Sequence, residues 1–467
     1  MAKKNKQFTL YNLSIDSAGN DGRSVGREND MVVFVENAVP GDVVDAFVYR
    51  KKRRFAEARA TVFHTLSPHR VEPVCSHFGV CGGCKWQNLN YEKQLEFKQN
   101  HVVDCLTRLI KIELPEILPI IGSEKKYFYR NKLEFTFSNK KWLINKDEEN
   151  SDTNSNALGF HIPGRFDKIL QIDKCYLQDD LHNQIRNFIY NYAVENNIDF
   201  FDLREQKGLL RTMMVRNTQK GEWLVMIMFF KNEELIIKEI LKALETKFPE
   251  IDNILYVINE KQNDTFFDLE TTTYKGVGYL TEEMEGLKFR INPKAFYQTN
   301  PSQAYILYQV ARDFAGLTGQ ELVYDLYTGT GTIANFVAHK AKQVIGVEYV
   351  KEAIDDAIIN SEINNVHNTK FFAGDMKDVL NDEFIATHGK PQVIITDPPR
   401  TGMHESVVNK ILEIAPQKVV YVSCNPATQA RDLALMDAKY IVTKVQPVDM
   451  FPQTHHIENV VLLELRK

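Results

Sequence analysis

The chain has 467 residues, a length sufficient for about two to four domains. Its formal net charge is -5, and 43% of its residues are hydrophobic and 25% are charged. The negative charge disfavours attraction of the whole protein to nucleic acid but says little about local patches. No apolar run approaches the roughly 20 residues that span a bilayer, and the N-terminus lacks the apolar segment of a signal peptide, so we expect a cytoplasmic protein with no membrane partner.

Short alternating apolar runs, separated by Gly and Asn clusters, occupy the first part of the chain. They begin at Gln7, Asp30, Asp42 and Ala58. Several short strands at this spacing predict a small closed barrel over residues 1–62, and barrels of the oligonucleotide-binding type hold single strands on basic and aromatic faces. The densest basic run, Arg50 to Arg54, would lie on such a face. The alternative interpretation of this run is a solvated hairpin.

Residues 63–290 show a mixed pattern that predicts a central α+β domain. Apolar spacing indicates a helix from Tyr91 to Leu109, with Cys105 in its core. Two strands are predicted, from Asn131 to Phe137 and from Ala157 to Ile162. The polar stretch between them, Asn145 to Asn156, is predicted to be a flexible hairpin tip.

Six cysteines are too few for a disulfide framework in a reducing compartment. Cys75, Cys81 and Cys84 are closely spaced, with two glycines that allow a tight turn, and this spacing indicates metal ligands. A fourth thiolate is available at Cys175. Four thiolates favour either an iron-sulfur cluster or zinc, and the spacing does not decide between them. The C-x3-C-x2-C spacing of radical enzymes is not found here.

From residue 291 to 467 the pattern changes to alternating strands and helices. Predicted strands are 321–327, 343–348, 369–375, 391–397 and 418–424, and predicted helices are 333–341 and 351–363. This alternation predicts a doubly wound parallel sheet, whose ligands bind at the carboxyl ends of the strands.

A glycine-containing loop, from Tyr327 to Thr332, follows the first of these strands and opens a helix, so that bare backbone can approach a ligand. Glu348, at the end of the next strand, is placed to bind a ribose hydroxyl pair. Asp375, after the third strand, could accept from an adenine amino group. The pattern admits both a dinucleotide and S-adenosylmethionine, although Ala334 replaces the third glycine of the dinucleotide fingerprint.

Cys424 ends the last predicted parallel strand and is a candidate nucleophile. A lone cysteine is usually a small apolar core residue, but this one follows Asp397-Pro-Pro-Arg400, at the end of the preceding strand, and precedes Glu458. Amine methyltransferases that use Asp-Pro-Pro follow it with an aromatic residue, whereas position 400 is arginine. A thiol one strand later therefore favours methylation of a carbon atom.

Carbon 5 of a uracil is a poor nucleophile until a thiolate adds to carbon 6, and the resulting enolate can then attack a methyl sulfonium. A base must afterwards remove the proton at carbon 5 so that the thiolate can leave. The chemistry requires one cysteine and one base. Glu458 is the candidate base, and His455 and His456 compete with it.

Together these motifs resemble the RNA uracil-5-methyltransferase family, and specifically its iron-sulfur branch that modifies 23S ribosomal RNA. The resemblance covers essentially the whole chain. It implies a TRAM barrel over residues 1–62, a central domain over 63–290 and a Rossmann-like class I methyltransferase domain over 291–467. It also implies four cluster ligands, namely Cys75, Cys81, Cys84 and Cys175.

By the same resemblance, the residues that bind S-adenosylmethionine are Gln298, Tyr327, Thr332, Glu348, Asp375 and Asp397. The substrate side of the site would contain Asp397 and Arg130, and the catalytic pair would be Cys424 and Glu458. Thr328 stands where the family commonly has a cysteine, a change that should be tolerated.

The resemblance implies a monomeric enzyme that makes 5-methyluridine in 23S ribosomal RNA, with a 4Fe-4S cluster favoured over zinc. The leading alternative is the same chemistry on a transfer-RNA uridine. Two further alternatives are an iron-sulfur or zinc RNA-binding protein with an idle methyltransferase domain, and a nicotinamide dehydrogenase.

Overall fold

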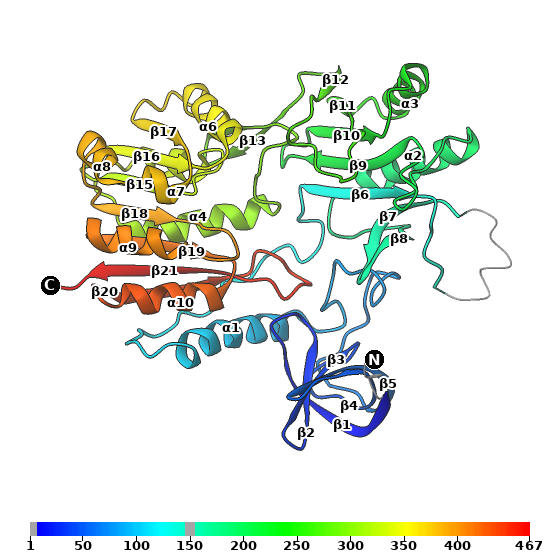
Figure 1. Cartoon of the computed structure of the whole chain (residues 1–467), viewed down its shortest axis with the longest axis horizontal. Helices are drawn as coiled ribbons and strands as arrows, with labels where there is room; N and C mark the ends of the chain where they lie inside the picture. The colour runs from blue at the N-terminus through cyan, green and yellow to red at the C-terminus, as the bar shows by residue number, and fades with distance from the viewer. Residues whose placement is uncertain (1–6, 145–154) are drawn as a thin grey trace.

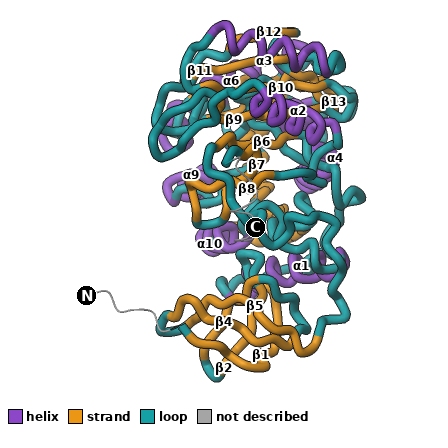
Figure 2. The backbone as a smooth tube through the Cα atoms, turned by 90° about the vertical axis from the view of Figure 1, so that its right-hand side faces the viewer, coloured by secondary structure: helices purple, strands orange, loops and turns teal. Residues whose placement is uncertain are grey.

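The computed structural model describes residues 7–144 and 155–467, so most of the predicted hairpin tip, 145–154, lies outside the described residues. The chain forms a small N-terminal barrel, a central sheet with two helices and a C-terminal sheet covered by helices (Figures 1 and 2). In the described ranges, no helix is both long and apolar enough to cross a membrane.

The N-terminal barrel is closed by five strands in the order β1-β2-β3-β5-β4, which confirms the predicted barrel. The strands are β1 (Phe8–Ala18), β2 (Ser24–Glu28), β3 (Met31–Glu36), β4 (Val43–Lys51) and β5 (Phe55–Thr65). Alternate side chains such as Leu13, Val33 and Val44 fill the interior. The sequence pattern does not predict the polar strand β2. Its Gly26 allows close approach to β1, because a Cβ there would lie 2.6 Å from the Ser14 carbonyl oxygen.

Helix α1 (Tyr91–Arg108) confirms the predicted helix, and its Cys105 is buried as expected. It packs against α10 (Pro426–Met436) of the C-terminal domain (Figure 1). Lys98 Nζ lies 2.6 Å from Asp449 Oδ1, and both side chains are fully buried. The Tyr91 hydroxyl donates to the other Asp449 oxygen at 2.8 Å. Buried polar contacts therefore attach α1 to the C-terminal domain.

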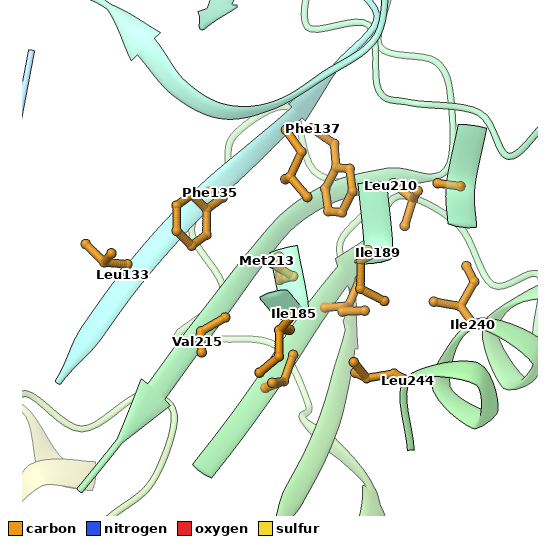
Figure 3. Close-up of a cluster of buried hydrophobic side chains, with 14 of the residues drawn as sticks. Leu133, Phe135, Phe137, Ile185, Ile189, Leu210, Met213, Val215, Ile240 and Leu244 are labelled. Atoms are coloured by element: carbon orange, nitrogen blue, oxygen red, sulfur yellow. The ribbon is translucent and has the colours of Figure 1, made fainter. Parts of the chain in front are cut away.

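The central sheet has seven strands in the order β12-β11-β10-β9-β6-β7-β8. Two of them, β6 (Lys132–Ser138) and β7 (Ala157–Ile162), match the predicted strands. The others are β8 (Arg165–Gln171), β9 (Leu210–Asn217), β10 (Trp223–Phe229), β11 (Asn253–Ile258) and β12 (Thr272–Lys275). Apolar residues of the sheet pack against α2 (Leu181–Glu195) and α3 (Glu234–Lys247), as Figure 3 shows.

A short hairpin of β13 (Leu280–Met284) and β14 (Leu287–Ile291) precedes the C-terminal sheet, whose order is β17-β16-β15-β18-β19-β21-β20. The parallel strands are β15 (Leu322–Leu326), β16 (Gln343–Glu348), β17 (Thr369–Ala373), β18 (Val393–Thr396) and β19 (Lys418–Ser423). Each coincides with a predicted strand. Strand β21 (Glu458–Leu465) runs antiparallel between β19 and β20 (Tyr440–Val448).

Helices cover both faces of this doubly wound sheet, as the alternating pattern predicts (Figure 1). They are α4 (Pro301–Ala315), α5 (Thr332–Ala338), α6 (Lys351–Ile363), α7 (Met376–Val379), α8 (Asp382–His388), α9 (Glu405–Ile414) and α10. Buried Val, Ile and Leu side chains on the strands form one apolar layer on each face.

Candidate active site

Cys424 directly follows β19 and leads into α10, whose first turn is capped by the Asn425 side chain. The register of the antiparallel pair places Ser423 opposite Asn459. Cys424 comes one residue after Ser423, and Glu458 comes one residue before Asn459. The two residues therefore lie opposite each other at the same edge of the sheet. Asp397 follows β18, which is the neighbour of β19 on its other side. The structure brings the predicted nucleophile, base and carboxylate together.

The Cys424 thiol is half-buried, and its surroundings act on its charge in both directions. Burial raises the pKa of this thiol to about 11, and the nearby carboxylates of Glu458 and Asp397 add to the rise. The guanidinium of Arg400 opposes them, because it carries a positive charge and hydrogen-bonds the sulfur. Arg400 is therefore the group that favours the thiolate, the nucleophilic form of a cysteine.

Glu458 and Asp397 form a close pair of carboxyl groups, of which Glu458 is buried and Asp397 is partly buried. Burial raises the pKa of both groups, and the charge of Asp397 raises the pKa of Glu458 further. A carboxylate with a raised pKa is a stronger base than an exposed one. Strongly perturbed carboxyl groups beside a thiol are also typical of catalytic sites.

The two histidines that compete with Glu458 are weak bases in this structure. Burial is the first cause that lowers the pKa of His455 to about 4 and that of His456 to about 3. One Arg400 nitrogen lies 3.5 Å from His456 Nδ1. The lowered pKa values of the histidines leave Glu458, whose pKa is raised, as the strongest base of the three.

Arg400 is a functional candidate to which the sequence analysis assigns no role beyond replacing an aromatic residue. Its carbonyl oxygen accepts from Asn425 Nδ2 at 2.9 Å and from Thr428 Oγ1 at 3.2 Å, so α10 and the loop after β18 hold each other in place. The available signal is its position directly after Asp397-Pro-Pro. Residues that follow adjacent parallel strands lie at the same edge of the sheet, so an arginine after β18 is expected near the residue that follows β19.

The glycine loop between β15 and α5 is held by polar contacts on both sides. Gly329 N donates to Glu348 Oε2 at 3.2 Å, which fixes the carboxylate of β16 beside the loop. The Thr328 hydroxyl donates to buried Asp325 at 2.5 Å. Gly331 has φ 73°, and a Cβ there would lie 2.8 Å from Ala357 Cβ. The loop is therefore preformed around bare backbone.

The other predicted cofactor residues follow successive strands of the sheet. Tyr327 follows β15 with φ 63° and lines a cavity of about 1000 Å³ beside α9 and α10. Thr332 begins α5. Asp375 follows β17, caps α7 and pairs with Lys377 at 3.1 Å, which lowers the pKa of its carboxyl. Because β15 to β18 are parallel, these side chains lie along one edge of the sheet.

Gln298 and Arg130 lie outside the sheet, and Arg130 is near residues that surround Cys424. Gln298 is buried, and its carbonyl oxygen accepts from Asn131 Nδ2 at 3.2 Å. The Arg130 guanidinium lies 5.5 Å from the Phe451 ring, whose centroid is 6.3 Å from that of His456. The central domain therefore forms one wall of the active-site region.

The four predicted metal ligands line one cavity of about 350 Å³ in the central domain. Burial is the first cause that raises the pKa of each thiol, to about 12 for Cys84 and about 11 for Cys175. Neighbouring cysteines add to the rise at Cys81, Cys84 and Cys175. All four are free of disulfides. In residues 7–144 and 155–467, no group of three or more His, Cys, Asp or Glu side chains is arranged to hold a metal ion. The cavity thus gathers the four thiols without forming a single-ion site.

Comparison with known proteins agrees with this arrangement. Residues 202–466 match the tRNA (Uracil-5-)-methyltransferase family, and residues 4–61 match the TRAM domain. The chain is 59% identical over 452 residues to an uncharacterized RNA methyltransferase of Bacteroides thetaiotaomicron, covering 96% of this chain and 99% of the relative. The chain is also 54% identical to an uncharacterized RNA methyltransferase of Porphyromonas gingivalis, covering 97% of this chain and 99% of the relative.

Among solved structures, the chain is similar to the Pyrococcus abyssi tRNA (uracil-54, C5)-methyltransferase in complex with S-adenosyl-L-homocysteine. The TM-score is 0.74 at 26% identity, covering 96% of this chain and 99% of that one. The family match spans more than half of the chain, and the TRAM match coincides with the five-stranded barrel. The chain therefore belongs to the tRNA (uracil-5-)-methyltransferase family.

Proposed function

We propose that this S-adenosylmethionine-dependent RNA uracil-5-methyltransferase modifies a specific uridine of 23S ribosomal RNA, with Cys424 as nucleophile and Glu458 as base. The observation that carries the mechanism is the meeting of four groups at one sheet edge. These are the Cys424 thiol, the Arg400 guanidinium and the carboxyl groups of Asp397 and Glu458.

In this mechanism the target base leaves its RNA context and enters the cleft. The Cys424 thiolate, favoured by Arg400, forms a bond to carbon 6 of the uracil and pushes an electron pair toward carbon 5. S-adenosylmethionine supplies the electrophilic methyl group that carbon 5 takes. The Glu458 carboxylate then removes the proton at carbon 5, and the bond between sulfur and carbon 6 breaks.

The cofactor residues divide the work along the sheet edge. Glu348 is held by the loop amide of Gly329 and is available to bind ribose hydroxyls. Gln298, Tyr327, Thr332 and Asp375 would contact the rest of the cofactor. Asp397 follows β18, and its amide donates to the carbonyl oxygen of Leu326 at the start of the glycine loop, so its carboxyl would lie between the cofactor and the uracil.

The cysteine cavity supports a 4Fe-4S cluster more than zinc. A single zinc ion draws four thiolates to about 2.3 Å from one centre, whereas the irons of a cluster each take one thiolate and keep the ligands apart. A cavity of about 350 Å³ lined by all four thiols suits the larger group. The residues Cys75, Cys81, Cys84 and Cys175 would hold it, and a fully ligated site of this kind leaves no open position for catalysis.

The barrel supports RNA binding through the turn between β4 and β5. Lys52, Arg53 and Arg54 are exposed there, whereas Arg50 is paired with Glu57 at 3.1 Å. Three exposed cations close together suit a phosphate backbone, despite the negative net charge of the chain.

A transfer-RNA uridine is the second candidate target. The archaeal structure that covers 96% of this chain belongs to a protein whose name specifies uracil-54 of transfer RNA. The four cysteines favour the ribosomal target, because the resemblance associates a cluster with that branch. The barrel does not discriminate, because the archaeal structure covers 96% of this chain.

The proposal is tested with transcribed 23S ribosomal RNA and transfer RNA that carry 5-fluorouridine, in the presence of S-adenosylmethionine. Fluorine at carbon 5 cannot leave as a proton, so a covalent complex of protein and RNA should accumulate. The Cys424→Ala variant should form no covalent complex, and the Cys105→Ala variant should form as much of the complex as the wild type. Sequencing of the trapped RNA identifies the uridine, and an adduct on transfer RNA alone would overturn the ribosomal assignment.

A further inference from the structure

The loop before β6 displays an aromatic ring in a backbone conformation that such residues rarely adopt. Phe128 has φ 53°, and its side chain is 42% exposed. The left-handed conformation is unfavourable for a residue with a Cβ, because the Cβ approaches the following carbonyl oxygen. The adjoining Tyr129 is buried and donates its hydroxyl to the Pro452 carbonyl oxygen at 3.0 Å. The backbone turn therefore buries Tyr129 and points its neighbour outward.

Hydrogen bonds to the segment after Cys175 hold this turn in place. Phe128 N donates to the Tyr176 carbonyl oxygen at 2.8 Å, and Arg130 N donates to that of Leu177 at 2.7 Å. The Phe128 and Tyr176 ring centroids are 6.0 Å apart, and Lys174 Nζ lies 5.3 Å from the Tyr176 ring. An exposed ring backed by a second ring and a cation is typical of a surface on which a nucleobase stacks.

A cavity of about 200 Å³ adjoins Phe128, and its lining includes Arg130, Asn131, Trp223 and Ser302. Two buried atoms of this lining, Arg130 Nε and Asn131 Oδ1, have no hydrogen-bond partner within the described part of the chain. Asn131 is only 2% exposed. Buried polar atoms are almost always paired, so two unpaired atoms on lining residues mark this as a polar part of the surface. Nucleobase edges carry both donors and acceptors and suit a polar lining.

The cavity shares Arg130 with the predicted substrate side of the active site but does not contain the reacting groups. Asn131 contacts the carbonyl oxygen of Gln298, and Pro301 and Ser302 begin α4 three and four residues later. Its lining does not include Cys424, Asp397 or Glu458. A nucleotide in this cavity would therefore be a neighbour of the one that reacts.

We propose that Phe128 and this cavity bind the base of an unpaired nucleotide that flanks the target uridine, with Phe128 as the stacking surface. The inference rests on the proposed RNA-methylating function. The occupant is an RNA base, because the cavity adjoins an exposed ring that is backed by a second ring, and its lining includes Lys125, Arg130 and Asn131. When the flanking base is bound here, the RNA is held open beside the uridine that must leave its stack.

The test compares full-length wild type with Phe128→Asn and Phe128→Tyr. Asparagine tolerates the left-handed backbone but removes the ring, whereas tyrosine keeps the ring. Dissociation constants for transcribed 23S ribosomal RNA and transfer RNA, and kcat/KM on whichever RNA accepts methyl groups, are the readouts. Loss of one stacked base weakens binding by about 5- to 150-fold. We expect Phe128→Asn to fall in that range, mainly through KM, and Phe128→Tyr to match the wild type.

Two further variants separate the ring from the cavity. Ser302→Trp should fill the cavity and weaken RNA binding while Phe128 stays in place. Phe267→Asn removes another exposed ring of the central domain, 62% exposed, and should leave RNA binding unchanged. Binding of S-adenosylmethionine and the melting temperature should stay as in the wild type for all variants.

An unchanged RNA dissociation constant in both Phe128→Asn and Ser302→Trp would overturn the subsite. A wild type that transfers no methyl group to either RNA would instead contradict the proposed function. The two failures are distinguishable, because RNA binding is measured without turnover.

Discussion

The protein contains two sites built from cysteine thiols, the sheet edge around Cys424 and the four-cysteine cavity of the central domain. Burial raises the pKa of the thiols in both. At the sheet edge an arginine hydrogen-bonds the sulfur and opposes the rise. In the cavity neighbouring thiols add to the rise at Cys84 and Cys175. A nucleophile needs its own surroundings to form the thiolate, whereas ligand thiolates are stabilised by the metal that they bind.

The largest effect is expected from removing the nucleophile. Cys424→Ala should abolish methyl transfer, with a loss of at least about 10⁴-fold in kcat, because a covalent route is lost as a unit. Release of tritium from carbon 5 of labelled uridine in RNA measures this directly. Cys105→Ala, which alters a buried thiol in α1, should retain turnover. Substantial turnover by Cys424→Ala would contradict the mechanism.

Removing the base should produce the next largest effect and a distinct signature. Glu458→Gln should slow turnover by about 10²-fold or more, and a covalent complex should accumulate even on RNA with ordinary uridine, because the proton at carbon 5 stays in place. Denaturing gel electrophoresis detects this complex. Glu464→Gln, on the same strand, serves as the control. Fast turnover by Glu458→Gln without a covalent complex would mean that another residue is the base.

Arg400 should control the pH dependence of the reaction. The guanidinium lowers the pKa of Cys424, so Arg400→Gln should raise that pKa further above its value of about 11. Below the pKa the thiolate fraction rises about tenfold for each increase of one pH unit. The rise of kcat/KM should therefore move to higher pH in this variant, and its activity at pH 7 should be lower than that of the wild type. Arg400→Lys should move the profile less, and a profile identical to the wild type would exclude this role.

The cysteine cavity should respond differently from the sheet edge. Under the proposed iron-sulfur assignment, Cys84→Ser should reduce bound iron and lower the melting temperature, because metal binding contributes to folding free energy. The kcat of the molecules that remain folded should stay close to the wild-type value. Iron analysis, thermal unfolding and active-site titration check these outcomes. A loss of kcat as complete as that of Cys424→Ala would mean that the cavity takes part in the chemistry.

The C-terminal sheet is well predicted from sequence because its strands are buried, its helices alternate with them and its motifs end the strands. The barrel and α1 follow from local patterns too, whereas β2 does not, since Gly26 and its polar neighbours give no apolar alternation. Strands β8 to β12 of the central sheet are not among the predicted strands, although β10 is a continuous apolar run. They pair across long separations, such as β6 with β9, and local patterns do not encode such pairing.

The residue order alone predicts the strand-end positions of Cys424, Asp397 and Glu458, and through them the kind of chemistry. Which groups act on the thiol emerges only in the folded chain, because the contact of Arg400 with Cys424 depends on the order of β18 and β19 in the sheet. The turn that exposes Phe128 likewise depends on hydrogen bonds to a distant segment. Residue chemistry is local, whereas pKa shifts and cavities arise from burial and long-range neighbours.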